Sequence, residues 1–236
     1  AGINSVTKSG TNDVHASAYY YVKSPALVGY RIKDNVLPVS EFSNKQYGLS
    51  LSGAIIKNKL FFYLNGELDR QETPITYTTD NSLAKSATLQ GISDFLNQQF
   101  NYSPGIYNLS KYNTQADRLT ARLDWNVNSR NALSLKYYHL KSFTTNKPST
   151  SGAPKNGRGP NEFAIPFSSA FYRTNNNFDI VIMDLNTTIN SEMSNYFKVG
   201  YSRLRDFRDM DGGFFPQVDI LNGDGTNLMA MTTFGT

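Results

Sequence analysis

Seven segments of this chain alternate apolar and polar residues with a period of two, and this pattern constrains the fold more than any other feature. In residues 46–55, Tyr47, Leu49 and Leu51 fall on one parity, while Gln46 and Ser50 fall on the other. Successive side chains of a β-strand point to opposite faces, so the pattern predicts strands with one apolar and one polar face. The predicted strands are 14–22, 46–55, 60–70, 118–127, 132–140, 178–189 and 196–208.

Two of these segments depart from strict alternation. The first half of 178–189 is apolar on both parities. The segment 196–208 alternates cleanly at first and then changes phase near residues 203–205, which predicts a β-bulge at that point.

The connections between the predicted strands alternate between short and long. Residues 56–59, 128–131 and about 190–195 are short and rich in asparagine, as hairpin turns are. Transmembrane β-barrels have short periplasmic turns and long extracellular loops. We therefore predict an all-β fold, a partial antiparallel transmembrane β-barrel of about seven strands with long extracellular loops. The long connections are roughly 23–45, 71–116, 143–175 and the tail from about residue 209.

One short loop helix is predicted near residues 83–100. Its apolar residues recur at helical spacing. We expect the helix to pack on its own loop and strands, and contact with a ligand is the alternative. The residues of this apolar face are Leu89, Ile92, Leu96 and Phe100.

Composition excludes several classes of protein. The mean hydropathy is −0.45 and no apolar run approaches the roughly 20 residues that a membrane-spanning helix requires. The net charge of +4 is scattered along the chain, so we expect no nucleic-acid partner. The absence of cysteine excludes a disulfide scaffold and a thiolate metal site. The chain begins without a signal peptide and ends in loop-like sequence, so we expect it to be a piece of a longer protein.

The opening residues 1–12 and the following Val14-His15-Ala16-Ser17-Ala18-Tyr19 resemble a signature of TonB-dependent outer-membrane receptors of the Oar-like subgroup. The block 42–63 resembles the next hairpin of that family, where Gly-Gly-Pro often replaces Ser52-Gly53-Ala54 at what we expect to be a turn. Residues 215–220 are also similar to an extracellular segment of the subgroup.

This resemblance implies a barrel closed by a plug in the bacterial outer membrane. Residues 1–12 would be the end of the plug domain, and 13–236 the N-terminal part of the barrel, ending inside an extracellular loop. The family takes up large or scarce nutrients with energy passed through TonB. The implied partners are the TonB complex and outer-membrane lipids, and a surface lipoprotein is a further candidate.

Charged residues on the polar parity are the candidate site residues. On a barrel wall they would face the lumen, where they could line a hydrated path or grip the plug. The simpler interpretation, which we favour, is that they form charge pairs that satisfy one another. The candidates are Glu67, Asp69, Arg118, Arg122, Asp124, Lys136, Asp184 and Lys198.

We expect no catalytic site, cofactor or metal. His15 and His139 lie far apart in the sequence, beside no carboxylate cluster, and residues 219–227 match a calcium loop poorly, so a turn is the default. Aromatic residues near strand ends are expected to form the interfacial girdle: Tyr19, Tyr20, Tyr21, Tyr47, Tyr63, Trp125, Tyr137 and Tyr138.

Four functions remain open on the sequence alone. Nutrient transport is the leading hypothesis, and a barrel with a surface-adhesion or secretion-associated role is the alternative. A soluble all-β glycan-binding module would bury the apolar strand faces under a second sheet. An outer-membrane enzyme would require convergent acid, base and nucleophile residues, which the sequence does not offer.

Overall fold

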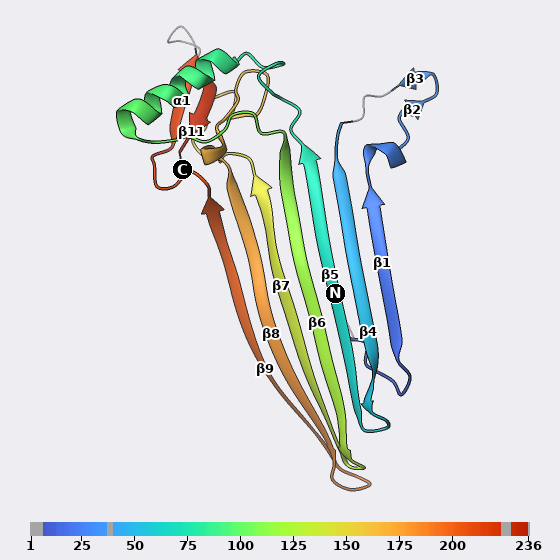
Figure 1. The fold of residues 1–236 in the computed structure, drawn as a ribbon. Coiled ribbons are helices and arrows are strands. Elements are labelled where there is room, and N and C mark those ends of the chain that lie inside the picture. The colour runs from blue at the N-terminus through green and yellow to red at the C-terminus, as the bar shows by residue number, and fades with distance from the viewer. Residues whose placement is uncertain (1–6, 37–39, 223–227, 236) are drawn as a thin grey trace.

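The computed structural model describes residues 7–36, 40–222 and 228–235. Seven long strands form one antiparallel, up-and-down sheet in the order β1-β4-β5-β6-β7-β8-β9 (Figure 1). This arrangement confirms the predicted all-β fold and its seven wall strands. The strands are β1 (His15–Lys23), β4 (Ser43–Ile56), β5 (Leu60–Pro74), β6 (Lys111–Asn128), β7 (Asn131–Asn146), β8 (Tyr172–Thr188) and β9 (Ser194–Met210).

The two ends of the sheet differ in the length of their connections. Short turns join β4 to β5, β6 to β7 and β8 to β9 at one end, and the long connections gather at the other (Figure 1). The segregation predicted from the sequence is therefore confirmed.

Most strands extend further toward the long loops than the alternation predicted. β6 begins at Lys111 rather than 118, and β8 begins at Tyr172 rather than 178. In these extensions both faces carry polar residues, such as Asn113 and Thr114 on β6. A strand that is polar on both faces has no period-two signal, so its ends are not visible in the sequence.

The bulge predicted near residues 203–205 is wrong. β8 and β9 pair without a register shift from Tyr172↔Met210 to Thr188↔Ser194. The apparent change of phase arises because the apolar face of β9 becomes charged at Arg203 and Arg205, while Leu204 supplies an apolar residue on the opposite face. The strand continues unchanged through this change of composition.

The Ser52-Gly53-Ala54 block also differs from its expected role, because it lies within β4 and not in a turn. The short turn follows at residues 57–59, and Asn58 adopts a left-handed conformation there with a φ of 60°. The register shift beside this turn falls between Ala54 and Ile56.

The long connections contain further elements, most of which the sequence analysis missed. The predicted loop helix is α1 (Ser86–Phe100). Two small hairpins were not predicted, because their strands are too short to show an alternation. These are β2 (Arg31–Ile32) with β3 (Asn35–Val36), and β10 (Val218–Asn222) with β11 (Met229–Phe234); the 3-10 turns are η1 (Pro25–Leu27) and η2 (Ser168–Ala170).

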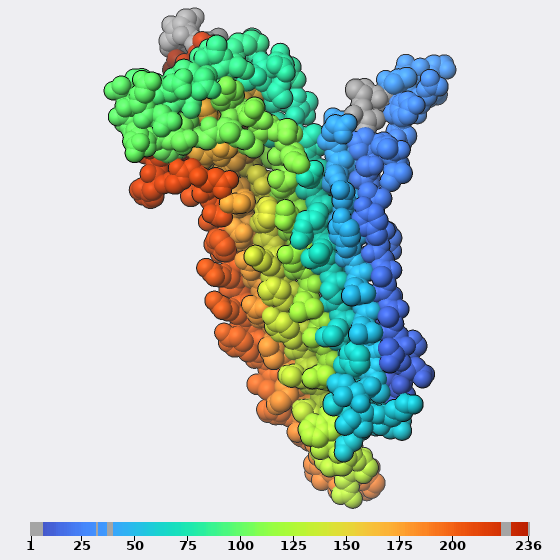
Figure 2. Space-filling view, in the orientation of Figure 1, coloured from blue at the N-terminus to red at the C-terminus, as the bar shows by residue number. Residues whose placement is uncertain are grey.

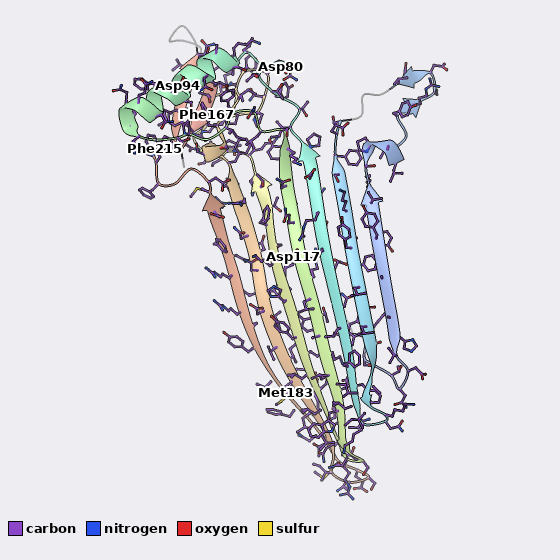
Figure 3. All side chains as sticks on the ribbon, in the orientation of Figure 1. Asp80, Asp94, Asp117, Phe167, Met183 and Phe215 are labelled. Atoms are coloured by element: carbon purple, nitrogen blue, oxygen red, sulfur yellow. The ribbon has the colours of Figure 1, made fainter. Side chains whose placement is uncertain are left out.

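The hydrophobic core of the described chain lies among the loops and not in the sheet. Segments 75–110, 147–171, 211–222 and 228–235, which we call the loop assembly, pack into one mass above β6–β9 (Figure 2). Phe167, placed between α1 and β11 in Figure 3, is fully buried. The core cluster is Ala84, Leu89, Leu96, Ile165, Phe167 and Phe234.

Helix α1 packs on this core, as predicted for its loop. Leu89 and Leu96 are buried, but Phe100, expected on the same face, is 59% exposed. The helix ends at Phe100, and Asn101 follows in the left-handed conformation, so Phe100 lies where the helix leaves the core. Among the described residues, no helix combines the length and the apolarity needed to cross a membrane.

Candidate functional site: the two faces of the sheet

The register assigns every wall residue to one of two faces. Paired residues of antiparallel strands point to the same face. Glu67 pairs with Arg118, which pairs with Leu140, and the same counting extends across the sheet. The polar face therefore carries the odd residues of β1 and β5 and the even residues of β4, β6, β7, β8 and β9.

The opposite face carries a continuous apolar belt. Its side chains are exposed rather than covered by a second layer, with Leu49 at 62% and Phe197 at 50% exposure. This contradicts a soluble sandwich and is typical of a wall facing hydrocarbon. The belt comprises Ala16, Ala18, Tyr20, Tyr47, Leu49, Leu51, Leu60, Phe62, Leu64, Leu68, Leu119, Ala121, Leu123, Trp125, Leu133, Leu135, Tyr137, Val181, Met183, Leu185, Phe197, Val199 and Tyr201.

The upper edge of the belt, toward the long loops, crosses the strands obliquely. Leu68 is a belt residue, but its partner on β6 is Asp117, and Leu119 in turn pairs with His139. On each strand, successive side chains of this face are two residues apart. Between β1 and β9 the edge moves down by two such steps, which is about 13 Å along a strand. Across a sheet about 29 Å wide, this implies that the strands tilt by about 25° from the membrane normal. Asp117 lies higher on the wall than the belt residue Met183 (Figure 3).

Only half of the predicted girdle residues belong to the apolar face. Tyr20 stacks on Tyr47 with ring centroids 5.0 Å apart, and both lie at the upper edge of the belt. Tyr137 and Trp125 also lie on this face. The girdle prediction is wrong for the other four tyrosines, which share the polar face: Tyr19, Tyr21, Tyr63 and Tyr138.

All eight candidate charged residues lie on the polar face, and the sheet brings them together in three groups. In the first, Arg118 Nη1 lies 2.6 Å from Glu67 Oε1 and 3.9 Å from Asp69 Oδ2. In the second, Arg122 Nε lies 2.8 Å from Asp124 Oδ2. The groups are separate salt bridges, and a role for them in transport stays a prediction.

The third group surrounds Asp184, whose side chain is only 5% exposed. Lys136 Nζ lies 2.6 Å from Asp184 Oδ2, and Lys198 Nζ lies 3.5 Å from Oδ1. The hydroxyl of Tyr196 donates a hydrogen bond of 2.7 Å to Asp184 Oδ1. This carboxylate is therefore satisfied from both neighbouring strands, β7 and β9.

Two tyrosines add hydrogen bonds beside the first and second charge groups, and the sequence did not single them out as site residues. The hydroxyl of Tyr19 donates to Glu67 Oε2, and Tyr138 forms a hydrogen bond with Thr7 Oγ1. Their parity is the signal that could have found them, because each falls on the polar side of its segment. Their ring size drew them into the girdle prediction instead.

The segment before β1 lies along the polar face. Arg122 Nη1 donates a hydrogen bond of 2.5 Å to the Thr7 carbonyl oxygen. Further along, Asn12 Oδ1 accepts a 2.7 Å hydrogen bond from the backbone N–H of Asn58, in the β4–β5 turn. Residues 7–12 therefore run along the polar face to the short-turn end of the sheet.

Gly10 in this segment is required by a close approach of backbones. A Cβ at residue 10 would lie 2.5 Å from the carbonyl oxygen of Gly53 and closer still to that of Phe62. Any larger residue would push the segment off the wall.

The structure also places a histidine and an aspartate considered in the sequence analysis. His139 lies beside one carboxylate and not a cluster, because its Nδ1 is 2.7 Å from Asp179 Oδ1 on the apolar face just above the belt. Asp219, from the weak calcium-loop match, pairs with Arg158 at 2.8 Å; residues 223–227 of that match lie outside the described residues. The described residues contain no group of three or more metal-ligating side chains.

The loop assembly presents an apolar groove between α1 and the β10–β11 hairpin. The groove has a volume of about 490 Å³ and is lined by Phe95, Phe100, Phe215 and Ile220 among others. Three loops are joined beneath it by backbone hydrogen bonds, including Phe167 N–H to Thr233 O at 2.9 Å. The long connections after β5 thus pack together as one body.

Comparison with known proteins agrees with this geometry. A family model described as an outer membrane beta barrel domain matches residues 6–115, from the segment before β1 into β6. No curated protein and no solved structure matches the chain. The uncovered apolar belt, the short turns at one end and this match together identify the chain as an outer-membrane β-barrel protein, located in the bacterial outer membrane.

Proposed function

We propose that this protein is a TonB-dependent receptor of the Oar-like subgroup that takes up a large or scarce nutrient. The observation that carries the proposal is the path of residues 7–12 along the polar face, bound to Arg122 and Tyr138. A chain that reaches β1 from the lumen is what the end of a plug domain requires. The opening motif supports the same reading.

In this proposal, residues 1–12 are the end of the plug, and 13–236 are the N-terminal part of the barrel, ending within an extracellular loop. The three charge groups lie on the lumen side, next to the segment that the plug would use. Arg122 is the central group, because it binds both Asp124 and the Thr7 carbonyl oxygen. Movement of the plug would exchange that second contact for water.

The proposed partners follow from this role. The TonB complex would act from the periplasm, outer-membrane lipids would surround the belt, and a surface lipoprotein could cover the loops. No catalytic role is proposed. The aromatic groove of the loop assembly offers a surface for the first contact with a nutrient.

A barrel with a surface-adhesion or secretion-associated role is the second candidate. The ordered loop assembly favours it, because a rigid extracellular body can bind another protein. This role requires no movement of residues 7–12 and no energy from TonB.

The test uses the absence of cysteine in the chain. In the intact protein, Thr7→Cys and Tyr138→Cys are joined by a short, reducible thiol crosslinker in cells. The nutrient is first found by comparing growth of a gene-deletion strain and its parent on single limiting nutrients. We expect crosslinking to abolish uptake of that nutrient, and reduction to restore it.

Each single-cysteine variant treated with the same reagent is the control and should keep its uptake. Deletion of TonB should abolish uptake without lowering the amount of protein in the membrane. A deletion strain that grows normally on every nutrient but loses adhesion or export would overturn the proposal in favour of the second candidate.

A further inference from the structure

The outer-facing side of the wall carries a row of charge directly above the belt. The first polar row from β4 to β9 consists of Lys45, Arg70, Asp117, His139, Asp179 and Arg203. The next row on β7–β9 adds Lys141, Asn177 and Arg205. Rows on one face are two residues apart, so all these groups lie within about 7–13 Å of the belt edge. We call these two rows the upper rim.

The acidic side chains of the upper rim already have partners. Asp117 Oδ1 lies 2.6 Å from Arg70 Nη2. Asp179 Oδ1 accepts a 2.7 Å hydrogen bond from Tyr137 and lies 2.7 Å from His139 Nδ1. Asp117 is thus paired with Arg70, and Asp179 Oδ1 is shared between Tyr137 and His139.

Four cations of the upper rim lie outside these pairs. Lys45, Lys141, Arg203 and Arg205 are exposed, and none of them makes a salt bridge within the described ranges. Arg203 stands opposite Asp179, whose oxygen is shared with His139 and Tyr137. Three of the four cluster on β7 and β9 on either side of Asn177: Lys141, Arg203 and Arg205.

The opposite edge of the belt has a different chemistry. The first polar row there, on β7–β9, consists of Asn131, Thr187 and Asn195, which carry no charge. On β7–β9, the two edges of the belt therefore present different side chains to the two headgroup regions of the membrane. On these strands the surplus positive charge lies at the edge beside the long loops, which is the extracellular side of an outer-membrane barrel.

We propose that the cluster Lys141, Arg203 and Arg205 binds the phosphate groups of the phosphorylated glycolipid that forms the outer leaflet. The acyl chains of the lipid would lie on the belt below, and its phosphates would reach the cluster. Guanidinium groups match phosphate with paired N–H donors, and a lysine supplies a mobile point charge. Such a contact requires no nutrient and no plug, so it is independent of the proposed function.

The test measures retention of lipid by the intact protein in mild detergent, using native mass spectrometry. The probes are diphosphorylated lipid A, the same lipid without phosphates, and inorganic phosphate as competitor. The variant combines Lys141→Gln, Arg203→Gln and Arg205→Gln. The control removes three exposed cations at the other end of the sheet, with Lys57→Gln, Lys59→Gln and Arg130→Gln.

We expect the rim variant to bind diphosphorylated lipid A about tenfold more weakly, equivalent to about 1.4 kcal/mol. The control should bind it as the unaltered protein does, and the lipid without phosphates should bind equally to all three. Equal retention by the rim variant, or an equal loss in the control, would overturn the proposal. So would complete displacement by millimolar inorganic phosphate, which would indicate a site for the free ion.

A second measurement does not depend on folding of the variant. In the unaltered protein, retention of diphosphorylated lipid A should fall steeply as sodium chloride is raised, because salt screens exposed charges. Retention of phosphatidylethanolamine, whose phosphate is balanced by its own ammonium group, should change little. Equal salt dependence for the two lipids would contradict recognition of the anionic phosphates of lipid A by the rim.

Discussion

Arg158 connects segments of the loop assembly through a single guanidinium group. It is 6% exposed, and its Nε lies 2.8 Å from Asp219 Oδ1 on β10. Its Nη1 donates to the carbonyl oxygens of Ser149 and Ser151 in its own loop. Thr233 on β11 donates to the same Asp219 oxygen at 2.7 Å. A buried charge with this many partners is stable only while all of them are present.

Replacing Arg158 should therefore open the loop assembly without unfolding the wall. For Arg158→Ala we expect a loss of about 3–5 kcal/mol in the stability of the loop assembly, because Asp219 keeps its charge and loses its partner. Limited proteolysis of the intact protein in detergent measures this as cleavage within residues 147–171.

The matched control is Arg173→Ala. Arg173 pairs with Asp209 and Asp211, but its side chain is 36% exposed, so its removal should cost less than about 1 kcal/mol. If both variants resist protease equally, the buried pair does not hold the loops together.

At the scale of the element, each wall strand has one face toward lipid and one toward water. On β6, Leu123 belongs to the belt, whereas Thr120 lies on the polar face, paired with Asn65 and Tyr138. The same strand therefore tolerates charge on one parity and not on the other, although both positions lie within the belt's height.

We expect Leu123→Arg to lower the free energy of unfolding from lipid vesicles by about 2–4 kcal/mol, because its charge lies near the middle of the bilayer. Thr120→Arg should change it by much less, since its side chain reaches water. Equilibrium unfolding in guanidinium chloride gives both values. A similar loss for the two variants would mean that the polar face is not hydrated.

At the scale of the whole molecule, the sheet and the loop assembly are held by different forces. The wall has backbone pairing and a belt that only lipid covers, whereas the loops have a buried apolar core. The loop assembly and the upper rim lie at the same end of the sheet. The orientation of the protein in the membrane therefore decides whether both face the cell exterior or the periplasm.

Cysteine labelling tests this orientation. Ser151→Cys in a long loop should react with a membrane-impermeant maleimide in whole cells. Ser129→Cys in the β6–β7 turn should react only after the outer membrane is permeabilised. Both serines are exposed and the chain has no cysteine of its own, so labelling reports access alone. The reverse pattern would place the short turns outside and contradict the extracellular assignment of the loops.

The sequence alone determined the two faces of the wall strands. Strict alternation such as that of residues 46–55 reports two faces, and it restricts the register to even shifts because a slip of one residue would exchange the faces. The eight charged candidates could be assigned to one face by parity, and so could Tyr19 and Tyr138, had parity been applied to them.

Only the tertiary structure decided which contacts these faces make and how the long loops pack. The pairing of Arg122 with Thr7, or of Arg158 with Asp219, joins residues 115 and 61 positions apart, and no local pattern specifies such a pair. The core of the loop assembly also depends on the tertiary structure. Phe167 and Phe234 pack in that core, but the segments that carry them show no apolar periodicity in the sequence. Local periodicity encodes the direction of a side chain, whereas its partner depends on the path of the whole chain.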